Sequence, residues 1–406
     1  MNHVEPFVLD NWVRKFKSLA KVTLHDTCVN PLSLDALFKF SAESQTTSVN
    51  TSTPISYGSV TGQPQLRERI TEFYRSQFPA QKTAELHVAI TQGTISANYL
   101  VLDTFLHPGD HVIVQYPTYQ QLFSVPRRGG VDVSLWKSDP KNNWSLDPEE
   151  LKRLVIKGKT KMIVINSPNN PTGASIPSTV LDEIVKIAAE NDVLILADEI
   201  FRPMYHGTSP DTELPPSITA WAGTYKNIIS TGSLSKGFSL PGLRIGWAVS
   251  PNSQIIDEIN LARDYVTLSV SGIDQEIATF ALWPDIRGKI LSRSAEICAK
   301  NLALLTEFVE EWRSKGKLRW VKPVVGASAF VQVFDSTGQP VDDKEYCERM
   351  IRETGLLIIP GGYTFGNGET SRDEWDFKGY LRVGFVCEQG LFKEALRVWG
   401  EYLGRD

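Results

Sequence analysis

The sequence predicts an α/β protein. Its large domain would have a mostly parallel sheet sandwiched by helices, and a smaller α+β domain would accompany it. The chain has 406 residues, of which 41% are hydrophobic and 22% are charged, a composition typical of a folded protein with room for two cores. In the middle of the chain, short β-branched runs alternate with helical patterns. Near residue 285 this alternation stops and a long amphipathic pattern begins.

Seven short runs predict the strands of the large sheet, because each is rich in β-branched residues and bounded by turn residues. Helical patterns separate several of them, for example ISANYLVLDTFL from 95 and STVLDEIVKIAAEN from 178. This order favours parallel strands covered by helices on both faces. The runs are HVAI from 87, HVIVQY from 111, VDVSLW from 131, KMIVIN from 161, VLILAD from 193, KNIIST from 226 and RIGWAVS from 244.

The C-terminal part has a different pattern. Residues 285–316 predict one long polar amphipathic helix, and AFVQVF from 329 and YLRVGFV from 380 predict strands. We therefore assign residues 46–284 to the large domain. Residues 1–45 and 285–406 together form the predicted small domain.

Composition and charge exclude several classes of function. The net charge is -5 and the basic residues are scattered, so we expect neither nucleic acid nor a membrane as a partner. No window reaches the roughly 18 apolar residues of a membrane span, and the N-terminus lacks the apolar core of a secretory signal. The four cysteines show no CxxC spacing, and the six histidines show no metal-ligand spacing. We expect no metal site and a cytoplasmic location.

Polar motifs follow the predicted strands, and ligands of open parallel sheets bind beyond the carboxyl ends of strands. The motif TQGTIS opens a helix, so Gly93 permits a close turn, while Thr94 and Ile95 can offer backbone amides to an anion. Asn170 lies in SPNNPTG, after a second strand. Asp198 ends a third strand, VLILAD. These groups should therefore converge at one edge of the sheet.

A fourth motif, SLSKGFSLPGLRIGW at 233–247, surrounds Lys236 with small and hydroxylated neighbours. A solvated lysine needs no such neighbours, whereas a lysine that lies against a bulky bound group does. Ser233, Ser235 and Arg244 would then contact an anionic part of that group.

Together these groups fit pyridoxal phosphate (PLP). The amine of Lys236 would form a Schiff base with the PLP aldehyde and later move a proton. The carboxylate of Asp198 would keep the ring nitrogen protonated. Asn170 would contact the 3-oxygen of the ring, and Ser233 and Arg244 would bind the phosphate.

The order and spacing of these motifs resemble the class I/II aminotransferases, which are fold-type I PLP-dependent enzymes. The resemblance runs from YGSVTGQPQLR at 57 through TQGTISA, YPTY, NNPTG, DEIF and SLSKGFSLPGLRIG to YLRVGF at 380. It implies that Tyr119 stacks on the PLP ring and that Arg382 binds the α-carboxylate of the substrate. It also implies a homodimer in which Tyr57 reaches the PLP phosphate of the partner. The N-terminal DTCVNPLSLDAL is similar to the capreomycidine synthase-like subgroup.

Each of these residues has an alternative structural interpretation. Lysines lie mostly at the surface, Asp often caps a turn, and Asn and Gly are common turn residues. A tyrosine can equally pack in a core or lie singly at the surface, and an arginine can form a structural salt bridge. These alternatives apply to Lys236, Asp198, Asn170, Gly93, Tyr119, Tyr57 and Arg382. No HExxH, GxGxxG or P-loop motif offers another catalytic interpretation.

The favoured function is a PLP-dependent aminotransferase that acts on an α-amino acid and a keto acid. Two departures from the family keep alternatives open: Phe201 replaces the usual tyrosine, and the loop PGGYTFG is one residue longer. The first alternative is a PLP-dependent cyclase or β/γ-elimination or replacement enzyme of the capreomycidine synthase type. The second is a non-catalytic sensor with the same fold. Tyr205 is a candidate donor of the missing hydroxyl, and His206 is a candidate to face the substrate.

Overall fold

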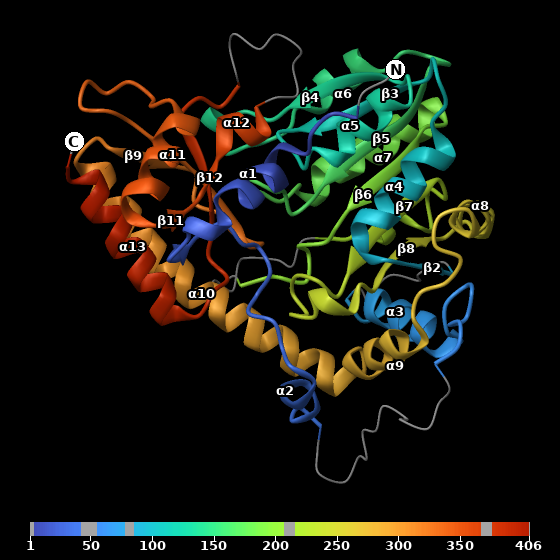
Figure 1. The fold of residues 1–406 in the computed structure, drawn as a ribbon. Helices are drawn as coiled ribbons and strands as arrows, with labels where there is room; N and C mark the ends of the chain where they lie inside the picture. The colour runs from blue at the N-terminus through green and yellow to red at the C-terminus, as the bar shows by residue number, and fades with distance from the viewer. Residues whose placement is uncertain (1–3, 42–54, 78–84, 207–215, 367–375, 406) are drawn as a thin grey trace.

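The computed structural model describes residues 4–41, 55–77, 85–206, 216–366 and 376–405. Its largest sheet has the strand order β2-β8-β7-β6-β5-β3-β4 (Figure 1). Adjacent strands are parallel except in the two pairs that contain β8. The predicted mostly parallel sheet is therefore confirmed. The strands are β2 (His87–Thr91), β3 (His111–Tyr116), β4 (Asp132–Lys137), β5 (Thr160–Asn166), β6 (Leu194–Asp198), β7 (Ile228–Ser233) and β8 (Gly246–Ser250).

Helices cover both faces of this sheet, because successive side chains of a strand point to opposite faces. In β6, Ile195 and Ala197 enter the core formed with α3, α6, α7 and α9. Leu196, between them, enters the core formed with α4, α5 and α8. The predicted sandwich is confirmed. The helices are α3 (Pro64–Ser76), α4 (Gly93–Phe105), α5 (Gln121–Arg128), α6 (Pro148–Leu154), α7 (Ser178–Asn191), α8 (Ser253–Asp264) and α9 (Gly272–Ala281).

The C-terminal part contains a second, antiparallel sheet in the order β12-β13-β10-β9. Trp12 and Phe16 of α1 are buried in the core beneath it, and β1 pairs with β11, so the N-terminal segment packs against this part of the chain. The elements are α1 (Val8–Phe16), β1 (Val22–Thr23), α2 (Leu34–Phe38), α10 (Pro284–Ser314), β9 (Leu318–Trp320), β10 (Ser328–Val333), α11 (Asp343–Thr354), β11 (Leu356–Leu357), β12 (Ile359–Pro360), α12 (Gly361–Phe365), β13 (Tyr380–Gly384) and α13 (Gln389–Leu403).

The division into domains at residues 45/46 and 284/285 stays a prediction. The first of these boundaries lies outside the described residues. The second falls at the start of α10, which crosses the lower part of Figure 1 from the large sheet to the C-terminal sheet.

The strand β8 begins two residues later than the sequence predicted. Arg244 has a left-handed backbone with φ of 52°, and it follows a short 3-10 turn at Pro241–Leu243. A residue in that conformation cannot continue an extended strand. The turn brings the guanidinium of Arg244 beside Gly93, at the carboxyl end of the sheet.

None of the described helices combines the length and apolar character that crossing a lipid bilayer requires. Within the same described ranges, no three or more His, Cys, Asp or Glu side chains gather in a way that could hold a metal ion. The four cysteines are free.

Candidate functional site

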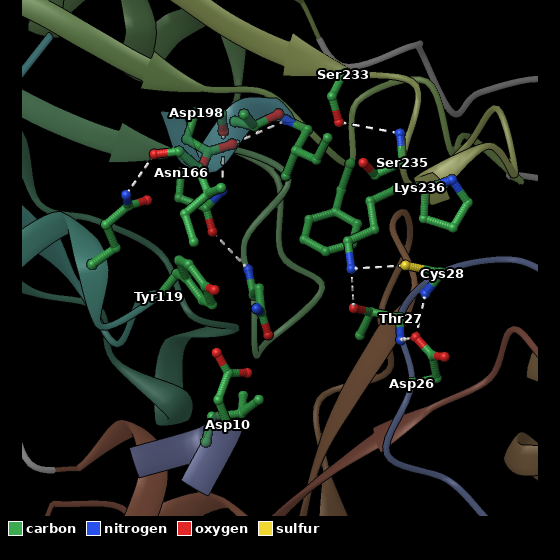
Figure 2. Close-up of a pocket in the computed structure, with 18 of the residues that line it drawn as sticks. Asp10, Asp26, Thr27, Cys28, Tyr119, Asn166, Asp198, Ser233, Ser235 and Lys236 are labelled. Carbon is green, nitrogen blue, oxygen red and sulfur yellow. Dashed lines mark hydrogen bonds between the residues drawn. The ribbon is translucent and has the colours of Figure 1, made fainter. Parts of the chain in front are cut away.

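A cavity of about 360 Å³ lies at the carboxyl ends of the large sheet, where α1 and the C-terminal sheet face the strands (Figure 2). Segments far apart in the sequence contribute to its wall. The predicted site residues that line it are Thr94, Ile95, Tyr119, Asn170, Asp198, Phe201, Ser233, Ser235, Lys236, Arg244 and Arg382. The convergence expected from the motifs is therefore present.

Asp198 ends β6, and its carboxylate is buried at the floor of the cavity. Asn98 Nδ2 donates to Oδ2 at 2.8 Å, and the backbone N–H of Ile200 donates to Oδ1 at 3.1 Å. Thr231 Oγ1 in turn donates to Asn98 Oδ1 at 2.7 Å, which fixes the orientation of the amide. Burial raises the pKa of Asp198 to about 6, although these hydrogen bonds and the charge of Lys236 favour the carboxylate.

An anion cradle lies at the N-terminus of α4. Gly93, the first residue of this helix, has φ of 74°, and a Cβ built on it would lie 2.7 Å from Arg244 Nη2. A side chain there would therefore collide with the guanidinium. Thr94 Oγ1 is buried without a hydrogen-bond partner among the described residues. Ser233 Oγ accepts from the N–H of Ser235 at 3.1 Å.

Lys236 extends into the cavity and meets the N-terminal segment (Figure 2). Its Nζ donates to Thr27 Oγ1 at 2.8 Å and to Cys28 Sγ at 3.2 Å. The ring of Phe201 lies on another side, with its centroid 5.7 Å from Nζ. The amine is therefore held at the edge of the cavity by short side chains.

Arg382, on β13, is buried and lines the cavity. Its Nη2 donates to the carbonyl oxygen of His25 at 2.5 Å, and its Nη1 donates to Asn170 Oδ1 at 3.3 Å. Its Nε is buried and has no partner among the described residues. Burial lowers the pKa of Arg382 to about 10, so the guanidinium remains charged at neutral pH.

Two aromatic side chains form part of the wall. Tyr119 lies below Asp198 and Asn166 in Figure 2, and burial raises the pKa of its hydroxyl. Its ring packs against Phe7, with centroids 5.0 Å apart. Phe201 lines the cavity without offering a hydroxyl.

Four residues singled out in the sequence do not line the cavity. Gly93 contacts Arg244 but does not line the cavity, and Tyr57 is 83% exposed outside it. His206, a candidate to face the substrate, does not line the cavity, and Nε2 of its buried ring donates to the carbonyl oxygen of Gly326 at 3.1 Å. Tyr205 is not among the lining residues either.

Several residues that line the cavity were not predicted from the sequence. Asn98 had a detectable signal, because it lies one helical turn after Thr94 and on the same face of α4. The N-terminal residues had none, because their approach depends on tertiary packing. The missed residues are Leu9, Asp10, Val13, His25, Asp26, Thr27, Cys28, Asn98, Gln121, Asn166, Ile200 and Pro241.

The family model for aminotransferase class I and II matches residues 35–397. The chain belongs to the class I and II aminotransferase family. It is 28% identical to capreomycidine synthase of Streptomyces vinaceus over 78% of this chain and 74% of the relative. It is 27% identical to aspartate/prephenate aminotransferase of Thermus thermophilus over 86% of this chain and 83% of the relative.

Solved structures agree with this assignment. The crystal structure of a PLP-dependent aminotransferase from Streptococcus suis superposes with a TM-score of 0.83 at 32% identity, covering 99% of this chain and 98% of that chain. The fold is therefore the fold-type I PLP fold, and this aminotransferase-family chain is a PLP-dependent enzyme.

The residues present fit PLP. The buried, unpartnered Thr94 Oγ1 and the first amides of α4 lie next to Arg244, as an anionic phosphate requires. Asp198 offers a buried carboxylate that forms no salt bridge with the cations of the described chain, as a protonated ring nitrogen requires. Lys236 offers the amine, and the cavity wall between these groups carries Tyr119.

The raised pKa of Asp198 predicts how the stability of the aminotransferase without PLP depends on pH. The folded state holds this proton up to about pH 6, whereas the unfolded chain releases it near the ordinary value of 3.8. The free energy of unfolding should therefore fall as pH rises from about 4 to 6, by up to about 3 kcal/mol from this residue. Asp198→Asn should show a correspondingly smaller fall. Urea unfolding of the PLP-free protein over this pH range measures the difference.

Asp343 provides a matched control, because burial also raises its pKa to about 6 and it does not line the cavity. Asp343→Asn should flatten the pH profile in the same way. Saturating PLP should stabilise the Asp343→Asn variant as much as it stabilises the wild type. It should stabilise the Asp198→Asn variant less. Parallel pH profiles for wild type and Asp198→Asn would contradict the burial of an ionising carboxylate.

Proposed function

We propose that the chain is a PLP-dependent aminotransferase that transfers the amino group of an α-amino acid to a keto acid. One observation carries this proposal: Lys236, Asp198 and Arg382 meet in a single cavity. The reaction needs a covalent attachment point, a partner for the ring nitrogen and a receptor for the substrate carboxylate. These three side chains can supply them.

PLP supplies an aldehyde for covalent attachment and a ring that withdraws electrons from the substrate Cα. In this proposal Lys236 holds the cofactor and then moves the proton at Cα. Asp198 keeps the ring nitrogen protonated, and its burial without a salt bridge supports this role, because a bound cation would compensate the buried charge. Tyr119 stacks on the ring, and Asn170 contacts the 3-oxygen.

The phosphate of PLP would bind at the N-terminus of α4. The amides of Thr94 and Ile95 point from the first turn of the helix, where the helix dipole favours an anion. Ser233, Ser235 and Arg244 would complete the site. The left-handed backbone of Arg244, which turns its guanidinium toward Gly93, supports this arrangement.

Incubation of the PLP-loaded protein with amino acids and a keto acid tests the proposal. Keto-acid-dependent transfer of 15N from the amino acid to a new amino acid, detected by mass spectrometry, is the expected result. Release of ammonia or of a cyclic product would replace the proposal with the second candidate below. No reaction with any amino acid, together with tight PLP binding, would favour a non-catalytic sensor.

Arg382 is the proposed receptor for the substrate α-carboxylate. Its guanidinium is buried, and its only hydrogen-bond partners among the described residues are two neutral oxygens, on His25 and Asn170. A carboxylate is a stronger acceptor for a planar guanidinium than either oxygen, because both of its oxygens can accept from the fork.

Replacing Arg382 should therefore weaken amino-acid binding. We expect Arg382→Ala to raise the dissociation constant by roughly one to three decades, since one charge-assisted pair contributes a few kcal/mol. Arg382→Lys should restore little of this affinity, because an ammonium lacks the planar fork. Titration of the PLP absorbance with amino acid measures affinity, and PLP content is the control. Unchanged affinity in Arg382→Ala would remove Arg382 from this role.

A second candidate function is a PLP-dependent cyclisation, or a β/γ-elimination or replacement, of the capreomycidine synthase type. The similarity to capreomycidine synthase and the absence of a hydroxyl at Phe201 support it. Asp10 adds a specific observation. Its carboxylate is exposed at the cavity mouth, points inward in Figure 2, and influences the pKa values of Tyr119 and Arg382. A carboxylate there favours a substrate whose side chain ends in a cation over one that ends in a carboxylate.

Asp10 should therefore set a preference for charge in the substrate side chain. Asp10→Asn should lower kcat/KM for arginine or lysine by about three- to tenfold, the scale of one partly exposed ion pair. It should leave kcat/KM for the neutral citrulline or norleucine unchanged. Asp35→Asn, on α2 away from the cavity, is the control. An equal effect on cationic and neutral amino acids would contradict the preference.

We also propose a homodimer with shared active sites. Large apolar or aromatic side chains are exposed in the segment before α3 and at the end of α8: Ile55 is 90%, Tyr57 83% and Tyr265 95% exposed. Exposure of several such side chains is typical of an interface between subunits. The resemblance of YGSVTGQPQLR to the family motif supports a role for Tyr57 at the PLP phosphate of the partner.

Analytical ultracentrifugation should give about twice the chain mass of 45.3 kDa. Tyr57→Phe should weaken PLP binding by about three- to thirtyfold, because it removes one hydrogen bond to a phosphate, without changing the mass or the melting temperature. A monomer with full activity would exclude the shared site. If the Tyr57→Phe variant is a dimer and binds PLP normally, only the proposed role of Tyr57 at the phosphate is excluded.

A further inference from the structure

A short N-terminal segment, residues 25–28, lies between Lys236 and Arg382 and contacts both. The carbonyl oxygen of His25 accepts from Arg382 Nη2 at 2.5 Å. Thr27 Oγ1, two residues later, accepts from Lys236 Nζ at 2.8 Å, and Cys28 Sγ lies 3.2 Å from the same nitrogen. Figure 2 shows both side chains turned toward the amine. The segment therefore reaches the two groups to which the proposed function assigns attachment of the cofactor and recognition of the substrate.

The backbone holds this segment in a defined position. Asp26 Oδ1 accepts from the N–H groups of Thr27 and Cys28 at 2.7 and 2.8 Å, which closes a tight turn. On the other side, Gly384 of β13 approaches so closely that a Cβ built on it would lie 1.7 Å from the carbonyl oxygen of Asp26. The N–H of Gly384 also donates to the carbonyl oxygen of Leu24 at 2.7 Å. These contacts fix the backbone that carries the Thr27 side chain. Thr27 is 4% exposed.

A threonine hydroxyl suits an amine that gains and loses a proton. It accepts from an ammonium, and by rotating it donates to the lone pair of a neutral amine. A thiol can do the same, although more weakly. A valine in place of Thr27 would keep the shape and offer neither interaction. The contact can therefore hold Nζ in one place through both protonation states.

We propose that Thr27 is a positioning residue that holds the amine of Lys236 beside the substrate Cα whenever this amine is not linked to PLP. In the proton transfer, the Cα–H bond breaks and its electron pair stays with the substrate, while the neutral amine of Lys236 takes the proton. The new N–H bond belongs to an ammonium that donates to Thr27 Oγ1. The reverse transfer returns the proton. Cys28 makes a secondary contact. This inference rests on the proposed role of Lys236.

The inference is tested by the exchange of the Cα proton of a bound amino acid with D2O. The PLP-loaded protein is used, and NMR monitors the exchange. Thr27→Val should slow exchange by about tenfold to a hundredfold, the scale of one charge-assisted hydrogen bond. The amino-acid dissociation constant, measured by titration of the PLP absorbance, should change less than about threefold. Thr27→Ser should restore most of the exchange rate. Cys28→Ala should slow exchange less than Thr27→Val does.

A second readout uses the PLP-free protein. Thr27 Oγ1 accepts a hydrogen bond from Lys236 Nζ, so Thr27→Val should release the amine from this contact. An amine-reactive label should then modify Lys236 several-fold faster, as measured by peptide mass spectrometry. Thr306→Val, which removes a hydroxyl that donates to the carbonyl oxygen of Leu302 within α10 and does not line the cavity, is the matched control.

The outcomes separate this inference from the proposed function. Absence of Cα exchange in wild type with every amino acid would overturn the proposed function. Normal exchange in Thr27→Val, or an equal loss of binding and exchange that Thr27→Ser does not restore, would overturn the positioning role alone. If Thr27→Val does not fold, as judged by circular dichroism, Thr27→Ala and Thr27→Ser provide the same comparison. An unchanged labelling rate of Lys236 in a folded Thr27→Val variant would also contradict the positioning role of Thr27.

Discussion

The site depends on a carboxylate that the fold keeps away from water and that forms no salt bridge with any described residue. Asp198 is 4% exposed, and its oxygens are satisfied by an amide side chain and one backbone N–H. A buried carboxylate in such surroundings is costly, as its raised pKa indicates. The supporting network of Asn98 and Thr231 orients the donors but adds no charge. The arrangement therefore suits a bound cation, and in the proposed function the protonated ring nitrogen of PLP is that cation.

A second constraint is the close approach of backbone segments at the anion cradle. A Cβ on Gly246 would lie 2.3 Å from the carbonyl carbon of Gly93, and a Cβ on Gly93 would collide with Arg244. Glycine at both positions lets β8 and the start of α4 meet, with Arg244 turned toward the helix terminus. The cost is backbone freedom lost on folding; the result is a compact site in which helix amides and a guanidinium face the same space.

The sequence predicted what local patterns encode. Buried β-branched runs specify the parallel strands, and the carboxyl ends of parallel strands meet, so Asp198, Asn170 and Lys236 could be brought together before the structure was known. Asp10 and Thr27 could not.

They reach the cavity only because α1 packs on the C-terminal core and because β1 pairs with β11 over two residues, which is too short to give a periodic signal. The surroundings of His206 are also set by distant parts of the chain. Tyr205 forms a bridge with Val325 and the His206 ring contacts Gly326, and the spacing from Asp198 along the sequence does not reveal such long-range contacts.

The central claim is that Lys236 is the residue to which PLP is covalently attached. Reduction of the PLP-loaded protein with borohydride, followed by proteolysis and mass spectrometry of the peptides, tests it most directly. If PLP is attached to Lys236, one pyridoxyl-modified peptide is expected, with the modification on Lys236. No modified peptide is expected from Lys236→Ala under the same conditions. A pyridoxyl group on a different lysine, or no adduct in protein that has bound PLP, would contradict it.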